Sequence, residues 1–128
     1  MVGHTHRHYR AFWRLLSGHA TLYTEMVSAS ALVAAADAPR PGDGDYLLAP
    51  CADANTVLQL GGDDARALAA ATRRACNLRA DLREVNINAG CPAIASGGAD
   101  YGATLMRDAA ATRRLVEAVR DAAPPSCA

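Results

Sequence analysis

The chain has 128 residues, of which 51% are hydrophobic and 20% are charged, so its length and composition predict one globular domain and argue against a disordered chain. Its thirteen basic and thirteen acidic residues cancel, which removes any overall electrostatic case for binding nucleic acid. All thirteen basic residues are arginine, so this chain cannot complete a mechanism that requires lysine. No apolar run approaches the length that spans a membrane.

Turn residues and hydrophobic patterning divide the chain into alternating elements. The first part of the chain is predicted to form a helix over 6–16, a strand over 20–26 and a helix that starts at Ser28 or Ser30 and ends near 36. A loop over 38–54 follows, then a strand over 56–60 and a helix that ends near 77. The last part is predicted to form a strand over 84–88, a glycine-rich loop to 102 and a helix over 108–122. Strands that alternate with helices are typical of βαβ units, so we expect an α/β fold with a parallel sheet.

Capping residues set the expected helix ends. Thr5 is the expected cap of the first helix, whose apolar face would be formed by Phe12, Leu15 and Leu16. Asp63 or Asp64 would cap the helix that ends near 77, with acid in its first turn and arginine (73 and 74) in its last. Two prolines, 124 and 125, stop the final helix.

The four cysteines, Cys51, Cys76, Cys91 and Cys127, lie far apart and form no C-x-x-C pair. Without a secretory signal they are predicted to be reduced thiols in a cytoplasmic protein. The arginine-rich, acid-free first 24 residues are also typical of an organelle transit peptide, although a helix explains them better.

One cysteine stands at a chemically favourable place, because the strand over 84–88 delivers Cys91 into a turn made by Gly90 and Pro92. A thiol at the carboxyl end of a strand can act as a nucleophile or as a general acid. The alternative is a plain small hydrophobic residue, which describes most cysteines.

Three alternating histidines, His4, His6 and His8, offer a second candidate, since they could ligate a metal. No cysteine or histidine cluster lies near them in the sequence to complete a ligand set. We therefore expect a solvated helix start and no metal site.

Five segments together resemble the tRNA-dihydrouridine synthases, in the subfamily that modifies the D-loop of bacterial and plastid-type tRNAs. These segments are the opening M-V-G-H-T-H-R-H-Y-R, Y-T-E-M at 23–26, L-Q-L-G-G at 58–62, N-I-N-A-G-C-P at 86–92 and Y-G-A-T-L-M at 101–106. The resemblance runs over nearly the whole chain, in order. It implies that residues 1–128 form the N-terminal part of a (β/α)8 TIM barrel that binds FMN, without the second half of the barrel and the C-terminal helical tRNA-binding domain.

The resemblance also implies roles for four residues in the flavin-dependent reduction of uridine, with NADPH as reductant. Met1 and Gln59 would contact the FMN, and Asn88 would hydrogen-bond the target base. Cys91 would be the general acid that protonates C5 of the uracil after hydride reaches C6. Glu25 would either make structural hydrogen bonds or contact the substrate.

Several positions depart from the family pattern. Gly3, His4 and His6 stand where the family has an acid, an aromatic residue and a second acid, and Ala93 and Ala95 replace a serine and an RNA-holding arginine. The chain is therefore expected to need a missing C-terminal half or a covering partner to act on tRNA. The alternative is a truncated, non-catalytic paralogue or gene-model fragment that serves at most as an interaction or folding remnant.

Overall fold

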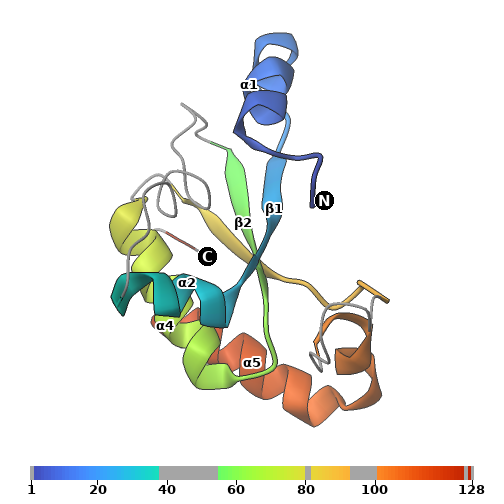
Figure 1. The fold of residues 1–128 in the computed structure, drawn as a ribbon, viewed down its shortest axis with the longest axis vertical. Helices are drawn as coiled ribbons and strands as arrows, with labels where there is room; N and C mark the ends of the chain where they lie inside the picture. Colours follow the sequence, from blue (N-terminus) through green and yellow to red (C-terminus); the bar gives the residue numbers. More distant parts are fainter. Residues whose placement is uncertain (1, 38–54, 80–81, 93–100, 126, 128) are drawn as a thin grey trace.

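A computed structural model of the chain describes residues 2–37, 55–79, 82–92, 101–125 and 127. Its elements, in chain order, are α1 (Arg7–Leu16), β1 (Leu22–Ser28), α2 (Ala29–Asp37), β2 (Thr56–Gly61), α4 (Ala65–Leu78), β3 (Glu84–Ile87), the 3-10 helix η1 (Gly102–Arg107) and α5 (Ala109–Ala122) (Figure 1).

The three strands form one parallel sheet in the order β1-β2-β3. Parallel neighbours require crossover connections, and α2 and α4 stand in the chain between successive strands. The predicted α/β class with a parallel sheet is thus confirmed. Closure into a barrel stays a prediction, because the described residues contain three strands and a barrel of this kind needs eight.

The hydrophobic core lies between one face of the sheet and the helices α2, α4 and α5, which gather in the lower half of Figure 1. Leu58 and Leu60 of β2 are fully buried and pack in one cluster with Leu68 of α4 and Leu115 of α5. Since side chains alternate along a strand, Gln59 between the two leucines points to the other face. The core cluster thus occupies one face of the sheet, and Gln59 stands on the other.

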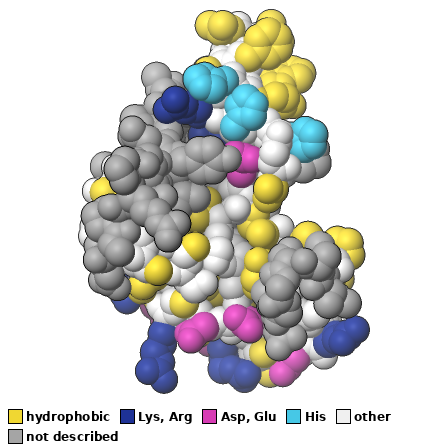
Figure 2. All heavy atoms as spheres, in the orientation of Figure 1, with side chains coloured by type: hydrophobic (Ala, Val, Ile, Leu, Met, Phe, Trp, Pro, Cys, Tyr) yellow, Lys and Arg dark blue, Asp and Glu magenta, His cyan; other side chains and the backbone are white. Residues whose placement is uncertain are grey.

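The first helix differs from its prediction in its cap and in its contacts. The side chain of His6, and not that of Thr5, caps α1 by accepting a hydrogen bond from the backbone N–H of Tyr9 at 3.3 Å. The expected apolar face is exposed, with Leu15 86% accessible, and these side chains form the hydrophobic top of the molecule in Figure 2. The opposite side of α1 attaches the helix to the segment that follows it. There the Arg14 guanidinium donates hydrogen bonds to the carbonyls of Ser17, at 3.2 Å, and Ala20, at 2.8 Å.

The remaining elements follow the predictions with local corrections. Asp64 caps α4 and Asp108 caps α5, each through its carboxylate. The first turn of α4 holds no acid and its last turn no base, so that part of the prediction is wrong. Strand β1 runs two residues further than expected, to Ser28, and β3 ends at Ile87, which leaves Asn88 just after the strand. The short helix η1 was not predicted from the sequence.

Candidate active site

Three amide side chains meet on the sheet face opposite the core. Gln59 of β2 pairs in register with Asn86 of β3, and its Nε2 donates to Asn86 Oδ1 at 2.9 Å. Asn88 Nδ2 donates to Gln59 Oε1 at 3.2 Å. All three residues are half-buried. The structure therefore brings together two of the predicted site residues, Gln59 and Asn88, and adds Asn86, which sequence reasoning missed although the N-x-N spacing puts both asparagines on one face.

Asn88 also builds the turn that carries Cys91. Its backbone N–H continues the ladder to Leu60 O at 2.8 Å, while its side-chain Oδ1 accepts from the N–H groups of Gly90, at 3.1 Å, and Cys91, at 3.0 Å. An asparagine that hydrogen-bonds the backbone two or three residues ahead is a recurring way to hold a turn. The turn thus depends on Asn88 as well as on the predicted Gly90 and Pro92.

The segment around η1 holds Cys91 from the other side. The Cys91 carbonyl accepts from the backbone N–H of Ala103 at 2.9 Å. Gly102 has φ +73°, and a Cβ atom built on it would lie 2.5 Å from the Cys91 oxygen. Only glycine accommodates both the positive φ and this close approach. Cys91 is a half-buried free thiol whose backbone is fixed at both ends of the turn.

Strand β1 contributes an irregularity beside Gln59. The register with β2 shifts between Tyr23 and Met26, which places one extra residue in β1. The Thr24 hydroxyl fills the gap, because its Oγ1 accepts from the Gln59 backbone N–H at 3.0 Å and donates to Glu25 O at 2.7 Å. The backbone of Gln59 is therefore anchored on both sides, by β1 and by β3.

The Glu25 carboxylate is engaged by the N-terminal segment, since Oε1 accepts from the Gly3 N–H at 2.6 Å. This contact is a structural hydrogen bond, one of the two roles expected for Glu25. It ties the segment before α1 to β1, where the N-terminal end of the chain lies in Figure 1.

The carboxyl end of β2 is kept free of side-chain bulk. A Cβ atom on Gly61 would lie 2.8 Å from Met26 Sδ and 3.0 Å from Tyr101 Cε2. Both side chains therefore approach the end of the strand over Gly61. Two motifs of the sequence, Y-T-E-M and the Y-G-A segment, meet here.

Four residues that the sequence analysis named cannot be located relative to this group. Met1, Cys51, Ala93 and Ala95 lie outside the described residues. Within the described parts of the chain, no group of three or more histidine, cysteine or acidic residues could hold a metal ion. Across the same residues, no helix has the length and apolar character needed to cross a membrane.

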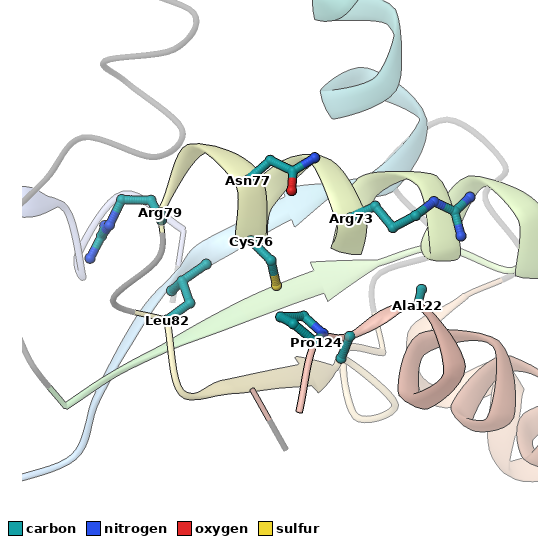
Figure 3. Close-up of a pocket in the computed structure, with 8 residues that line it drawn as sticks. Arg73, Cys76, Asn77, Arg79, Leu82, Ala122 and Pro124 are labelled. Atoms are coloured by element: carbon teal, nitrogen blue, oxygen red, sulfur yellow. The ribbon is translucent and has the colours of Figure 1, made fainter. Parts of the chain in front are cut away.

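A cavity of about 410 Å³ lies elsewhere, between α4 and the end of α5, and is lined by Cys76, Leu82 and Pro124 among others (Figure 3). Burial, then the charge of Cys127 and a hydrogen bond with its thiol, raise the pKa of the Cys76 thiol to about 12. A thiol held in its protonated form is a poor nucleophile, so Cys76 does not compete with Cys91 as a reactive group.

Comparison with known proteins gives one consistent result. The family profile described as Dihydrouridine synthase (Dus) matches residues 1–126. The tRNA-dihydrouridine(20/20a) synthase of Yersinia pestis is 38% identical over 122 residues, which are 95% of this chain and 33% of the relative. The tRNA-dihydrouridine(20/20a) synthase of Escherichia coli (strain K12) is 40% identical over 124 residues, 94% of this chain and 32% of the relative. The chain thus spans about a third of the length of the curated relatives it matches.

Proposed function

Because this chain belongs to the dihydrouridine synthase family, we propose that it carries the general-acid half of a site that reduces uridine to dihydrouridine in the D-loop of tRNA. The observation that supports this most is the turn that carries Cys91, whose backbone is held by Asn88 and Ala103, while the Asn88 side chain is hydrogen-bonded to Gln59 where parallel strands end. The names of the relatives, tRNA-dihydrouridine(20/20a) synthases, agree with this chemistry. The tRNA substrate makes the cytoplasm the proposed location.

The amide of Gln59 fits the polar edge of a flavin ring. A carboxamide has two N–H donors and two acceptor lone pairs. The contacts with Asn86 and Asn88 use one of each, which leaves one donor and one acceptor for a ligand. We propose that Gln59 holds FMN in this way, and that Met1 adds an apolar contact with the ring. When bound, the reduced flavin supplies a hydride to C6 of the uracil, with NADPH as the source of its electrons.

The role of Cys91 is to complete the reduction with a proton. The Sγ–H of Cys91 donates to C5, on the face opposite to the incoming hydride, so the C5=C6 double bond becomes a single bond. The resulting thiolate regains a proton from water. The target base has to leave its stack to reach this turn, as in other enzymes that modify bases.

Asn88 is proposed to contact the target base through the one hydrogen-bond donor that its side chain does not use within the protein. Its Oδ1 already accepts two backbone N–H groups and one Nδ2 proton is given to Gln59. The second Nδ2 proton is left to donate to a carbonyl oxygen of the uracil. The asparagine thus serves the Cys91 turn and the base together.

We further propose that residues 1–128 act as the N-terminal part of a (β/α)8 barrel that is completed by a C-terminal half or by a covering partner. The alternative is a non-catalytic remnant, and it is supported by the alanines at 93 and 95, where the family has a serine and an arginine. An enzymatic test with and without a second half distinguishes the two.

The test joins residues 1–126 to the C-terminal two thirds of the Escherichia coli relative and supplies unmodified tRNA, FMN and NADPH. We expect dihydrouridine from the chimera, measured by mass spectrometry of digested tRNA, and none from the 128-residue chain alone. Cys91→Ala in the chimera should lower the rate by about 10²–10⁴-fold. Cys76→Ala, a thiol outside the site, is the matched control. Undiminished activity of the Cys91→Ala chimera would refute the proposal, and an inactive but folded chimera would favour the remnant.

A further inference from the structure

We propose that Asn86 is a positioning residue that holds the Gln59 carboxamide by accepting a hydrogen bond from its Nε2 group, so that a defined edge of the amide faces a ligand. Asn86 is the last of three amide side chains, after Asn88 and Gln59, that are joined by hydrogen bonds in one direction starting from the Cys91 turn. We call this series of hydrogen bonds the relay. The consequence for flavin binding rests on the function proposed above. The relay itself rests only on contacts within the chain.

The direction of the relay follows from two backbone groups. The N–H groups of Gly90 and Cys91 can only donate, so the Asn88 atom that meets them must be the oxygen, Oδ1. The Nδ2 group of Asn88 therefore faces Gln59, and the Gln59 atom it meets, at 3.2 Å, must be Oε1.

The last step reaches Asn86. With Oε1 toward Asn88, the Nε2 group of Gln59 points to Asn86, whose Oδ1 accepts at 2.9 Å. Each amide thus fixes the orientation of the next. A flip of Gln59 would set donor against donor at Asn88, whose orientation is fixed by the turn, and Asn86 would have to flip as well to keep its hydrogen bond.

The rest of Gln59 has little freedom to compensate. Its backbone N–H is bound by the Thr24 hydroxyl at 3.0 Å, and its position in β2 is paired in register with Asn86. The side chain is half-buried, with one N–H and one lone pair of Oε1 left over. A ligand thus meets a donor and an acceptor in one fixed order. The matching chemical class is a ring edge with a carbonyl oxygen next to an N–H, as in an imide or a lactam.

The sequence offers a sharp probe, because Gln59 is the single glutamine among the 128 residues. Labelling the chain with side-chain ¹⁵N-glutamine gives one NH₂ group in an NMR spectrum, with two proton signals. We expect one proton of the wild-type chain to exchange with solvent at least tenfold more slowly than the other, since it is donated to Asn86. Equal, fast exchange of both protons would overturn the relay, and this measurement needs no variant.

Substitutions at Asn86 then test the assignment. Asn86→Ala should shift the protected proton signal and raise its exchange rate about 5- to 30-fold, the range expected for losing one or two kcal/mol. Asn86→Asp should restore protection, because a carboxylate oxygen accepts the same bond. The matched control is Asn77→Ala, an exposed asparagine of α4, which should leave both signals unchanged. An unchanged spectrum in folded Asn86→Ala would also overturn the assignment.

A titration with FMN, followed by flavin fluorescence and absorbance, adds the ligand readout. Asn86→Ala should weaken binding about 5- to 30-fold and shift the flavin absorbance band, and Asn86→Asp should recover most of both. Equal affinity of wild type and Asn86→Ala would refute the positioning role. If FMN fails to bind both the wild-type chain and the chimera with a second half, while the NMR pattern is as expected, the cofactor proposal fails and the relay stands.

Discussion

The Cys91 turn shows how single residues specify the candidate site. Asn88 binds the turn from before the cysteine, and the Ala103 N–H binds its carbonyl from after it. The second contact brings Gly102 so close to the Cys91 oxygen that no side chain fits between them. The backbone of Cys91 is therefore held by an asparagine side chain, a backbone N–H group and the close approach of a glycine.

Two glycines with similar backbone angles allow the cost of this approach to be measured. Gly102 and Gly3 have φ +73° and +77°, but a Cβ atom on Gly3 would meet nothing within 4 Å. We expect Gly3→Ala to lower the free energy of unfolding by roughly 1 kcal/mol, the cost of a left-handed conformation. Gly102→Ala should lower it by roughly 2–4 kcal/mol, since the clash with Cys91 is added. Urea denaturation measures both, and equal losses would contradict the close contact.

Cys76 makes stability depend on alkaline pH. Its folded-state pKa is raised to about 12 from an ordinary value of 9.0, so the folded chain holds this proton more tightly than the unfolded chain. The resulting stabilisation is fully present below pH 9 and declines as the pH rises from about 9 toward 12.

The corresponding variant is Cys76→Ala, which has no proton to lose. Urea midpoints measured at pH 8 and pH 10.5 should fall less for Cys76→Ala than for the wild type. The control is Asn77→Ala, the neighbouring residue without a titratable group. Equal declines in wild type and Cys76→Ala would show that the thiol does not contribute.

At the level of elements, the helices that cover the sheet are started by aspartates. Asp64 Oδ1 accepts from the N–H groups of Arg66, at 2.7 Å, and Ala67, at 3.1 Å, and Asp108 serves α5 in the same way. These bonds satisfy donors that a helix leaves unpaired in its first turn. They also fix where α4 begins, at Ala65, with three residues between it and the end of β2 at Gly61.

Adjacent aspartates provide a controlled test of the cap. Asp64→Ala should lower the free energy of unfolding by about 1 kcal/mol, because two N–H groups lose their acceptor and a negative charge leaves the helix N-terminus. Asp63→Ala removes the same charge type one residue earlier, where the carboxylate does not cap α4. Its expected effect is within about 0.5 kcal/mol. Chemical denaturation followed by circular dichroism compares the unfolding free energies of the two variants. A larger loss of unfolding free energy for Asp63→Ala than for Asp64→Ala would show that Asp64 is not the cap.

At the scale of the whole molecule, apolar residues divide into a buried set and an exposed set. The buried set joins the sheet to α2, α4 and α5. The exposed set includes Phe12, Leu15 and Leu16 of α1, which stands apart from the other helices in Figure 1. The stability of the described fold is thus expected to come from the first set.

Two leucines test this division. Leu58 is fully buried and Leu15 is 86% exposed. Leu58→Ala should cost about 2–5 kcal/mol of unfolding free energy, since it leaves a cavity in the core. Leu15→Ala should change it by no more than about 0.5 kcal/mol. A large loss for Leu15→Ala would show that α1 packs against something in solution, and sedimentation would then reveal whether a second copy covers it.

Features that depend on residues close together in the chain could be predicted from the amino-acid sequence. Local patterning, capping and glycine or proline punctuation indicated the helix start near Asp108, the strand over 56–60 and the Cys91 turn. They left Asp63 and Asp64 open as the cap of α4, and the structure selects Asp64. The roles expected for Gln59 and Asn88 came from the family resemblance, and the structure brings the two side chains together, because parallel strands have their carboxyl ends at one edge. The five family motifs pointed to the same family as the comparison with known proteins.

Features that depend on residues far apart in the chain could not be predicted and became visible in the folded structure. The bond from the Thr24 hydroxyl to Gln59, the place of Asn86 beside it and the approach of Gly102 to Cys91 each need segments to meet at a particular register. The exposure of the α1 face is a second example, since periodicity marks an apolar face but not what covers it. The physical reason is that local propensity acts over a few residues, while a hydrogen bond between strands is set by the packing of the whole sheet.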